Sequence, residues 1–552
     1  MSTDFDYVIV GAGSAGCVLA DRLTEDGSAS VLLVESGGND WSPLIRMPSA
    51  LALAMNIERA NWNYRSEPEP HLDGRRITCP RGRVIGGSSS INGMVYIRGN
   101  AMDFESWDRA GARGWAYADV LPYFKRAEAR EEGGDGYRGS DGPLHTSYGP
   151  LANPLYGAFV EAGRQAGYPV TEDVNGFQQE GFGRMDRTVH DGVRWSAARA
   201  YLDRARARPN LTVWTGCLAE RVLFEGRRAV GLAGRIAAHR VEARARREVV
   251  LAGGAINSPQ LLMLSGIGPG AHLAEHGIPV VADRPGVGGN LTDHLEFYFQ
   301  VACREPITLY GALGRLRQAK IGARWLVKRD GLGATNHFES CGFIRSRPGV
   351  EWPDLQYHFL PAAISYNGKD LAEQHGYQAH VGPMRSKSRG RVSLRSAEAG
   401  DAPEIRFNYM SHPDDWTEMR AAVRLTREIF AQDAFAPYRG EEISPGADAT
   451  GDEAIDAFIR RHVESAYHPC STCRMGADTD PHAVVGPDAR VIGVEGLRVA
   501  DSSVFPTITT GNLNAPTIML AEKASDHIRG MRPLPPSNLP FFRAEGWETA
   551  QR

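Results

Sequence analysis

A glycine-rich turn near the N-terminus constrains the fold more than any other stretch of this chain. Residues 5–10 predict a buried strand, which leads directly into Gly11-Ala12-Gly13-Ser14-Ala15-Gly16 and then into an apolar helix through Leu23. In such a unit the first glycine permits a tight turn, the second lets backbone approach a pyrophosphate, and the third lets the helix pack on the strand. The phosphate then lies at the positive helix N-terminus. The pattern predicts a doubly wound α/β unit that binds a dinucleotide.

The following strand supports this interpretation. Val31-Leu32-Leu33-Val34 ends in Glu35, about where an acidic residue binds the ribose hydroxyl pair. A glycine triplet also occurs in ordinary loops, but its position between two strands, with Glu35 after the second, favours dinucleotide binding. The fingerprint does not distinguish NAD from FAD.

Length and charge limit the other possibilities. A chain of 552 residues exceeds one ordinary core, so we expect two or more domains, either successive or interleaved. With 62 basic and 66 acidic side chains and a net charge of -4, nucleic-acid binding is not expected.

The sequence pattern also bears on localisation. The N-terminal residues have neither the basic n-region nor the apolar h-region of a secretory signal, and no apolar run approaches the ~20 residues of a spanning helix. The 7 cysteines are odd in number and scattered, which fits a reducing compartment better than a disulfide framework. We expect a cytoplasmic protein, with loose contact with the inner face of a membrane left open.

Two more glycine-containing regions follow along the chain. The loop Pro80–Met94 can lay backbone N–H groups along a phosphate or a flavin ring, although a glycine-rich surface connection is an equal alternative. Residues 103–129 are expected to be helical, and residues 131–142 to form a flexible loop. A strand over residues 248–252, followed by Gly254–Gly268, repeats the order of strand, glycine pair and apolar helix.

Five motifs in this order carry a family resemblance. They are Gly11–Glu35, Gly86–Met94, Gly254–Gly268, His468 and Gly511–Thr517. Together, from residue 5 to about residue 530, they resemble the glucose-methanol-choline (GMC) family of FAD-dependent oxidoreductases. Within it, the chain is similar to the bacterial branch that oxidises choline, on the residues Asn290–Glu296, Thr335–Arg345, Gln356–Pro361 and Tyr366–Gly368.

The resemblance implies a mixed α/β fold with two interleaved domains. A Rossmann-like FAD-binding domain would be assembled from residues 1–150, 200–292 and 462–530. A sheet-based substrate-binding domain, residues 151–199 and 293–461, would cover the flavin, and residues 531–552 would form a C-terminal tail.

The same resemblance implies which residues bind FAD. They are Gly11, Gly13, Ser14, Ala15, Gly16, Glu35, Gly86, Gly87, Ser88, Asn92, Gly93, Met94, Ala219, Asp501 and Asn512. Asp501 resembles the acidic residue that ends a strand near the ribityl and phosphate portion of the flavin, with a helix N-cap as its alternative. Some family oxidases tether FAD through a histidine after the Gly-Gly pair, where this chain has Ile91, so we expect FAD to be non-covalent.

Alcohol oxidation by a flavin needs a group that takes the hydroxyl proton while hydride leaves carbon. Histidine, with an ordinary pKa of about 6.5, suits this task near neutral pH. His468, in Ala466–Gly476, matches the catalytic histidine of the family, and Asn512 matches a His or Asn that faces the same oxygen. An amide can hydrogen-bond the alkoxide but is not an efficient base, so His468 is expected to be the sole strong base. His358 matches a second histidine that orients the alcohol, with a structural role as its alternative.

Choline has a permanent positive charge on a group without a proton to donate, so its site needs a carboxylate or aromatic faces. Glu296 matches the position where choline-oxidising relatives place a carboxylate, and a solvated surface glutamate is its alternative. Trp62 and Tyr467 are candidate aromatic faces. Tyr298 is a weaker one, since most aromatic residues in a chain of this size belong to the core.

Cys470 and Cys473 form a C-x-x-C pair, which elsewhere indicates zinc or thiol redox chemistry. No second pair or suitably spaced ligand cluster accompanies it in the sequence. We therefore expect no metal site.

The sequence thus predicts FAD-dependent oxidation of a primary alcohol. The expected reaction takes choline to betaine aldehyde, and onward to glycine betaine through the hydrated aldehyde. Another aliphatic primary alcohol, a non-redox lyase on the same fold, and a catalytically silent flavin-binding protein are the alternatives. The electron acceptor, a respiratory carrier or O₂, and the oligomeric state are left open.

Overall fold

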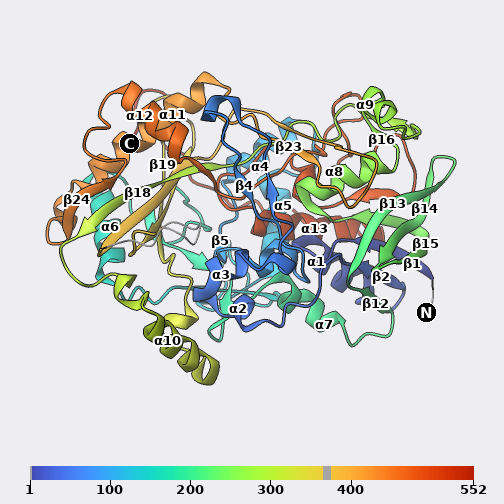
Figure 1. The fold of residues 1–552 in the computed structure, drawn as a ribbon, viewed down its shortest axis with the longest axis horizontal. Helices are drawn as coiled ribbons and strands as arrows, with labels where there is room; N and C mark the ends of the chain where they lie inside the picture. The colour runs from blue at the N-terminus through green and yellow to red at the C-terminus, as the bar shows by residue number, and fades with distance from the viewer. Residues whose placement is uncertain (1–2, 365–373) are drawn as a thin grey trace.

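The computed structural model describes residues 3–364 and 374–552 and contains two large sheets side by side (Figure 1). One sheet is parallel at its centre and the other is antiparallel. The segment Tyr366–Gly368, which contributed to the family resemblance, lies outside the described residues.

The apolar N-terminal strand lies inside the first sheet, as its sequence predicts. The strand order is β12 (Leu211–Trp214), β2 (Val31–Val34), β1 (Asp4–Val10), β15 (His239–Leu251), β14 (Arg228–Ile236) and β13 (Cys217–Glu225), and β26 (Leu497–Val499) also pairs with β15. The end of β15 runs parallel to both β1 and β26, whereas its beginning forms an antiparallel ribbon with β14. The carboxyl ends of β1, β2, β15 and β26 therefore meet at one edge, where ligands of doubly wound sheets bind.

Three helices pack together beside this sheet. The predicted helix after the first strand is α1 (Ser14–Thr24), which packs against α13 (Asn514–Arg529), and α13 packs against α5 (Tyr117–Ala127). The predicted helix after β15 is α8 (Gly254–Leu264). The strand-turn-helix predictions at both glycine motifs are confirmed.

Residues 103–129 are largely helical, as expected, but the helix is interrupted. The chain forms α4 (Ala101–Arg109) and α5, and ends this region in the short strand β6 (Glu128–Arg130). Gly111 and Gly114 lie between the two helices with φ of 98° and 81°, a conformation that favours glycine and ends a helix. Residues 131–142 form no helix or strand, although the fully buried Arg138 ties this loop to Glu128.

The second sheet is antiparallel throughout. Its order is β24 (Arg439–Ser444), β18 (Leu295–Cys303), β21 (Gly376–Pro383), β20 (Leu355–Leu360), β19 (Ser340–Ile344) and β8 (Gly181–Arg184), and β25 (Glu464–Ser465) also pairs with β18. α6 (Pro154–Gln165) packs against β8 and β19, and α11 (Pro413–Phe430) packs against β21. α12 (Asp452–His462) lies beside α11. A large buried aromatic cluster, including Phe159, Phe359 and Phe430, joins α6 and α11 to the sheet.

The two sheets are connected through the segments that frame the functional region. β18 begins directly after the loop 286–294, and β25 leads into the turn that carries His468. The C-terminal residues 531–552 lack helices and strands and pack back onto the body, where Arg552 pairs with Glu428. Among the described residues, no helix combines the length and the apolar character that crossing a bilayer requires.

Candidate functional site

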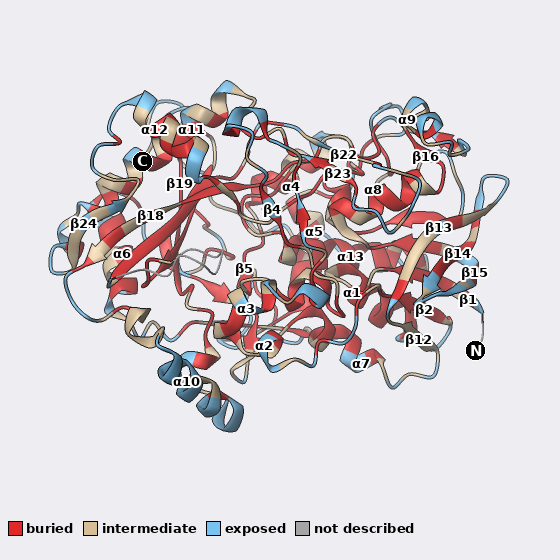
Figure 2. Cartoon of the chain, viewed as in Figure 1, coloured by how far each residue is buried: buried red, intermediate tan, exposed pale blue. Residues whose placement is uncertain are grey.

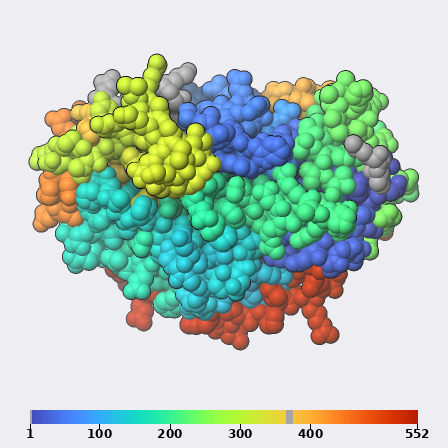
Figure 3. Space-filling view, turned by 90° about the horizontal axis from the view of Figure 1, so that it is seen from below, coloured from blue at the N-terminus to red at the C-terminus, as the bar shows by residue number. Residues whose placement is uncertain are grey.

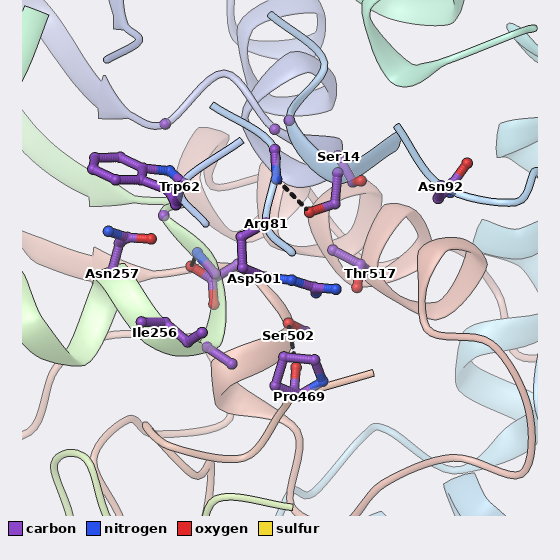
Figure 4. Close-up of a pocket in the computed structure, with 18 of the residues that line it drawn as sticks. Ser14, Trp62, Arg81, Asn92, Ile256, Asn257, Pro469, Asp501, Ser502 and Thr517 are labelled. Carbon is purple, nitrogen blue, oxygen red and sulfur yellow. Dashed lines mark hydrogen bonds between the residues drawn. The ribbon is translucent and has the colours of Figure 1, made fainter. Parts of the chain in front are cut away.

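A cavity of about 310 Å³ lies where the two sheets meet. Its walls come from the β1–α1 turn, the end of β2, the loop 80–94, the start of α8, the turn 466–469, and the segments 501–502 and 512–517. Figure 4 shows Ser14, Trp62, Asp501 and Thr517 reaching this space from segments far apart in the sequence. The fold therefore brings both ends of the chain to one site.

The glycines at one end of the cavity are required by close backbone contacts. A Cβ on Gly16 would lie 1.8 Å from the Gly11 carbonyl oxygen, and one on Gly87 would lie 2.6 Å from Gly13 Cα. Gly13 differs, because its Cβ would meet no protein atom closer than 3.9 Å and the residue lines the cavity. A side chain there would fill cavity space that a pyrophosphate can use, at the N-terminus of α1. This cradle fits the diphosphate of FAD.

Glu35 closes the same end of the cavity. Its Oε2 accepts a hydrogen bond from the Ala12 N–H at 3.0 Å, and its Oε1 accepts one from the Gly37 N–H at 2.7 Å. Burial raises the pKa of Glu35 to about 7, and these backbone donors and Arg83 oppose the rise. Carboxylate oxygens retain lone pairs for ribose hydroxyl donors, so the geometry fits the predicted role.

The other predicted cofactor residues mostly line the cavity as well. Ala219 lies on β13, and Ser14 donates from Oγ to Asn514 Oδ1 at 2.7 Å. The cavity is also lined by Gly11, Ala15, Gly87, Ser88, Asn92, Gly93, Met94 and Asn512. Gly86 and Gly16 lie behind this wall and shape the turns, and Gly86 has a φ of 87°.

Asp501 is both a cavity residue and a helix N-cap. Its Oδ1 accepts from the Ser503 N–H at 2.8 Å, which caps a 3₁₀ turn. Its Oδ2 accepts from the Gly254 N–H at 2.8 Å and from Ser258 Oγ at 2.6 Å. The two interpretations of this residue are therefore compatible, because one carboxylate joins the end of β26 to the start of α8.

His468 lies in a turn that is held from two sides. Its backbone N–H donates to Asp293 Oδ1 at 2.7 Å, and the other oxygen of this buried carboxylate accepts from Tyr409 Oη at 2.6 Å. Tyr467 has a φ of 66°, which bulky residues rarely adopt, and its carbonyl accepts from Arg81 Nη2 at 2.6 Å. A strained backbone of this kind persists only where surrounding contacts fix it. Here those contacts hold the turn so that His468 faces the cavity.

The hydrogen bonds of His294 determine which tautomer of His468 is present. His294 Nε2 lies 2.9 Å from the Met384 carbonyl oxygen, which can only accept, so this nitrogen carries a proton. Burial lowers the pKa of His294 to about 3, so the ring is neutral and its Nδ1 is an acceptor. His468 Nδ1 lies 3.0 Å from that atom and therefore donates to it. The hydrogen bonds thus leave the lone pair of His468 on Nε2.

The free nitrogen of His468 faces Asn512. Asn512 Nδ2 lies 3.1 Å from His468 Nε2, and Asn512 Oδ1 lies 3.2 Å from both Gln356 Nε2 and His358 Nε2. Gln356 and His358 point the same way because they are two residues apart on β20. The structure therefore gathers His468, Asn512 and His358, the three predicted catalytic residues, in one network.

Burial lowers the pKa of His468 well below its ordinary value, and the nearby His294, His358 and Arg81 act in the same direction. Burial likewise lowers the pKa of His358, although Glu296 opposes this. His468 is consequently neutral near pH 7 and can accept a proton at Nε2.

Glu296 lies on β18 and lines the cavity. Its Oε1 lies 3.0 Å from His380 Nδ1. Gln378 Oε1 accepts from the Ile364 N–H and from Gln300 Nε2, so Gln378 Nε2 is the donor to His380 Nε2 at 2.7 Å. His380 Nε2 is thus an acceptor, which leaves Nδ1 of His380 to donate to Glu296 Oε1. Glu296 therefore presents a carboxylate that one ring orients at the cavity.

The predicted aromatic candidates are placed differently. Trp62 lines the cavity, but Arg83 lies over its ring at 4.9 Å and Tyr64 stacks beside it at 5.7 Å. Tyr467 also lines the cavity, whereas Tyr298 does not and instead lies against His380, with ring centroids 4.2 Å apart. Tyr467 is the better placed of these rings.

The C-x-x-C pair lies in the protein core, which suits a structural role. Cys470 and Cys473 are fully buried, and burial raises the pKa of Cys470 to about 12. In the part of the chain that the structure describes, no group of three potential metal-ligating side chains is found.

Several functional residues were missed in the sequence. Arg81, Asp293 and His294 fix the base through contacts distant in sequence, so only the fold reveals them. A local signal existed for His380, because Gln378-Ala379-His380 repeats the pattern Gln356-Tyr357-His358, and His358 and His380 are paired across β20 and β21.

Comparisons with known proteins identify the family of this chain. The family models for GMC oxidoreductases match residues 5–296 and 386–521. An oxygen-dependent choline dehydrogenase of Brucella ovis is 61% identical over 549 residues, 99% of this chain and 100% of the relative. One of Rhizobium etli is 59% identical, with 97% of each chain covered.

Solved structures of two oxidases superimpose on this chain over nearly its whole length. Pyridoxine 4-oxidase from Mesorbium loti superimposes with a TM-score of 0.87 at 33% identity, covering 96% of this chain and 99% of the other. A formate oxidase structure gives a TM-score of 0.90 at 25% identity, covering 96% and 98%.

Proposed function

This chain belongs to the GMC oxidoreductase family and is an FAD-dependent alcohol oxidoreductase, and from this premise we propose that it oxidises choline to betaine aldehyde. The observation that carries the substrate assignment is the carboxylate of Glu296, which lines the cavity and contacts His380 Nδ1 at 3.0 Å. Relatives that are about 60% identical over their full length and named for choline support it.

Bound in the cavity, FAD supplies the acceptor for the hydride that leaves the alcohol carbon. His468 Nε2 takes the hydroxyl proton, since its tautomer leaves a lone pair there and its lowered pKa keeps it neutral. Without substrate, Asn512 Nδ2 donates to His468 Nε2 at 3.1 Å. With the alcohol bound, the same N–H group donates to the alkoxide oxygen instead. His358 orients the same oxygen through Asn512.

The cation is held at the other side of the alcohol. Glu296 attracts the quaternary ammonium group, and Tyr467 and Trp62, which also line the cavity, offer aromatic faces. Glu464, opposite Glu296 between β18 and β25, pairs with Arg75 at 2.8 Å, so Glu296 is the carboxylate that meets the cation. A neutral alcohol of the same shape gains nothing from this charge.

The proposal also covers the attachment of FAD, the location of the protein, the electron acceptor, the domains and a second substrate. FAD is non-covalent, because the buried Ile91 at the cavity wall has no nucleophile to form a bond. The protein works in the cytoplasm and passes electrons to O₂ or to a respiratory carrier. Residues 1–150, 200–292 and 462–530 form the FAD-binding domain and residues 151–199 and 293–461 the substrate-binding domain. The hydrated aldehyde is a second substrate that gives glycine betaine.

An anaerobic substrate panel tests this function. The FAD-loaded protein is mixed with choline, betaine aldehyde, neutral primary alcohols and a cyanohydrin, and flavin absorbance is followed. Choline should bleach the flavin fastest. Bleaching by neutral alcohols alone would assign another substrate, and no bleaching by any alcohol would favour a lyase or a silent flavoprotein. Admitting air afterwards measures the rate of reoxidation by O₂, which separates an oxidase from a dehydrogenase.

A further inference from the structure

Helix α10 (Arg315–Lys328) is attached to the protein by one side only. Figure 2 shows it projecting from the body and coloured as exposed over most of its length. Trp325 is its buried residue, at 1% exposure, and the indole N–H of Trp325 donates to the Gly192 carbonyl at 2.7 Å. This ring packs on the following turn η7 (Gly331–Ala334), where a Cβ on Gly333 would lie 2.7 Å from Trp325 Cβ.

The helix face opposite Trp325 is apolar although it faces solvent. Leu316, Ala319, Ala323 and Val327 recur at intervals of three and four residues, so they form one stripe along the helix. Leu316 and Val327 are each 82% exposed. Nine residues separate Leu316 from Trp325, a rotation of about 180°, so the stripe points directly away from the attachment.

Every charged side chain of α10 is a cation. They are Arg315, Arg317, Lys320, Arg324 and Lys328. Arg324 pairs with Asp330 at 2.6 Å, whereas Arg317, Lys320 and Lys328 lie along one flank of the apolar stripe. Exposed apolar residues bordered by cations are typical of a helix that lies in a membrane interface.

The apolar surface continues onto neighbouring elements. η7 contacts η1 (Pro48–Ala50), which connects α2 (Pro43–Arg46) and α3 (Leu51–Met55). Figure 3 shows α10 and η7, in yellow, beside this blue N-terminal segment on one face. Six of the twelve large hydrophobic side chains exposed in the described residues belong to these elements: Leu44, Leu53, Leu316, Leu326, Val327 and Leu332. A seventh, Trp41, lies two residues before α2. This concentration on one side of the molecule indicates a docking surface.

We propose that α10 and these adjoining side chains dock the protein onto an anionic lipid surface, with the apolar stripe inserted between head groups. Charge complementarity favours an anionic lipid surface over a second copy of the protein. A second copy in a symmetric contact would bring two cationic helices together, which is unfavourable. A nucleic acid would leave Leu316 and Val327 unused. Since Leu51 and Met55 of α3 line the cavity, docking places one cavity wall near the lipid.

This inference does not depend on the proposed substrate, and vesicle flotation of the FAD-loaded protein tests it. Wild type should float with vesicles of phosphatidylcholine containing phosphatidylglycerol, float far less with pure phosphatidylcholine, and lose binding as salt is added. The triple variant Arg317→Gln, Lys320→Gln, Lys328→Gln should bind about a hundredfold more weakly. The variant Leu316→Ser, Val327→Ser should bind at least tenfold more weakly even at low salt.

Matched controls use other exposed positions. Arg221→Gln, Arg227→Gln, Arg240→Gln on the β13–β15 ribbon and Val170→Ser, Val280→Ser should leave flotation unchanged. Activity with a soluble acceptor should be unaffected in all variants. The proposal is overturned if wild type does not bind anionic vesicles, or if α10 variants and controls bind equally. A dimer that dissociates in the Leu316→Ser, Val327→Ser variant would assign the surface to a second copy instead.

Discussion

His468 Nδ1 lies 3.0 Å from His294 Nδ1, and the carbonyl oxygen of Met384 on the far side of His294 decides which ring donates. This one-way chain holds the lone pair of His468 on Nε2, facing Asn512. Replacing His294 by an apolar side chain would leave His468 Nδ1–H buried without an acceptor and free the ring to change tautomer.

We therefore expect His294→Leu to lower kcat/KM for choline by about tenfold to a hundredfold, since an unsatisfied buried donor costs about 1–3 kcal/mol. His294→Asn is the matched variant, because the amide oxygen reaches nearly the same place as His294 Nδ1 and should restore most of the activity. FAD content should equal wild type in both. Equal losses in the two variants would show that His294 acts only through packing.

Glu296→Gln tests the cation site. The substitution keeps the shape and removes the charge, so we expect kcat/KM for choline to fall about a hundredfold, while kcat/KM for the neutral isostere 3,3-dimethylbutan-1-ol changes less than about threefold. Glu464→Gln, on the paired strand β25 but outside the cavity wall, is the control and should affect both alcohols little. A parallel fall for both alcohols would mean that Glu296 serves structure rather than recognition.

Arg81 should contribute to the pH at which activity is lost in acid. Burial lowers the pKa of His468, the nearby histidines add to this, and the positive charge of Arg81 acts in the same direction. Since only neutral His468 accepts a proton, Arg81→Gln should raise this pKa and move the acid limb of kcat/KM to higher pH. Arg76→Gln, which removes a surface partner of Glu67, should leave the profile in place. If the acid limb of kcat/KM in Arg81→Gln stayed at the wild-type pH or moved to lower pH, the electrostatic role of Arg81 would be contradicted.

Gly16→Ala should damage the cofactor cradle. The new Cβ would lie 1.8 Å from the Gly11 carbonyl oxygen, which is backbone and cannot give way without separating α1 from β1. We expect a loss of about 1–3 kcal/mol in stability and a reduced ratio of bound FAD to protein. Gly157→Ala in α6 meets no atom within 4 Å and should be neutral or stabilising. Thermal unfolding with flavin release monitors both variants, and similar curves would argue against the close approach.

The sequence was sufficient to predict elements whose local pattern agrees with the overall fold. The turn at Gly11 and strand β2 could be predicted because glycine geometry and apolar runs are local properties. Residues 103–129 are largely helical, as expected, but the positive φ of Gly111 and Gly114 separates α4 from α5, and the sequence alone did not reveal these φ values. In the site, motifs located His468, Asn512 and Glu296. The contacts that orient them, such as His294 with Met384, join residues 90 positions apart and follow only from the fold.

The central claim is that His468 accepts the alcohol proton, and anaerobic stopped-flow mixing of FAD-loaded His468→Ala with choline tests it most directly. The exposed His239→Ala serves as control. We expect His468→Ala to keep FAD and to reduce its flavin at least a hundredfold more slowly than wild type, in line with the loss of a general base, while His239→Ala is unchanged. A His468→Ala protein that reduces its flavin at close to the wild-type rate would contradict the account.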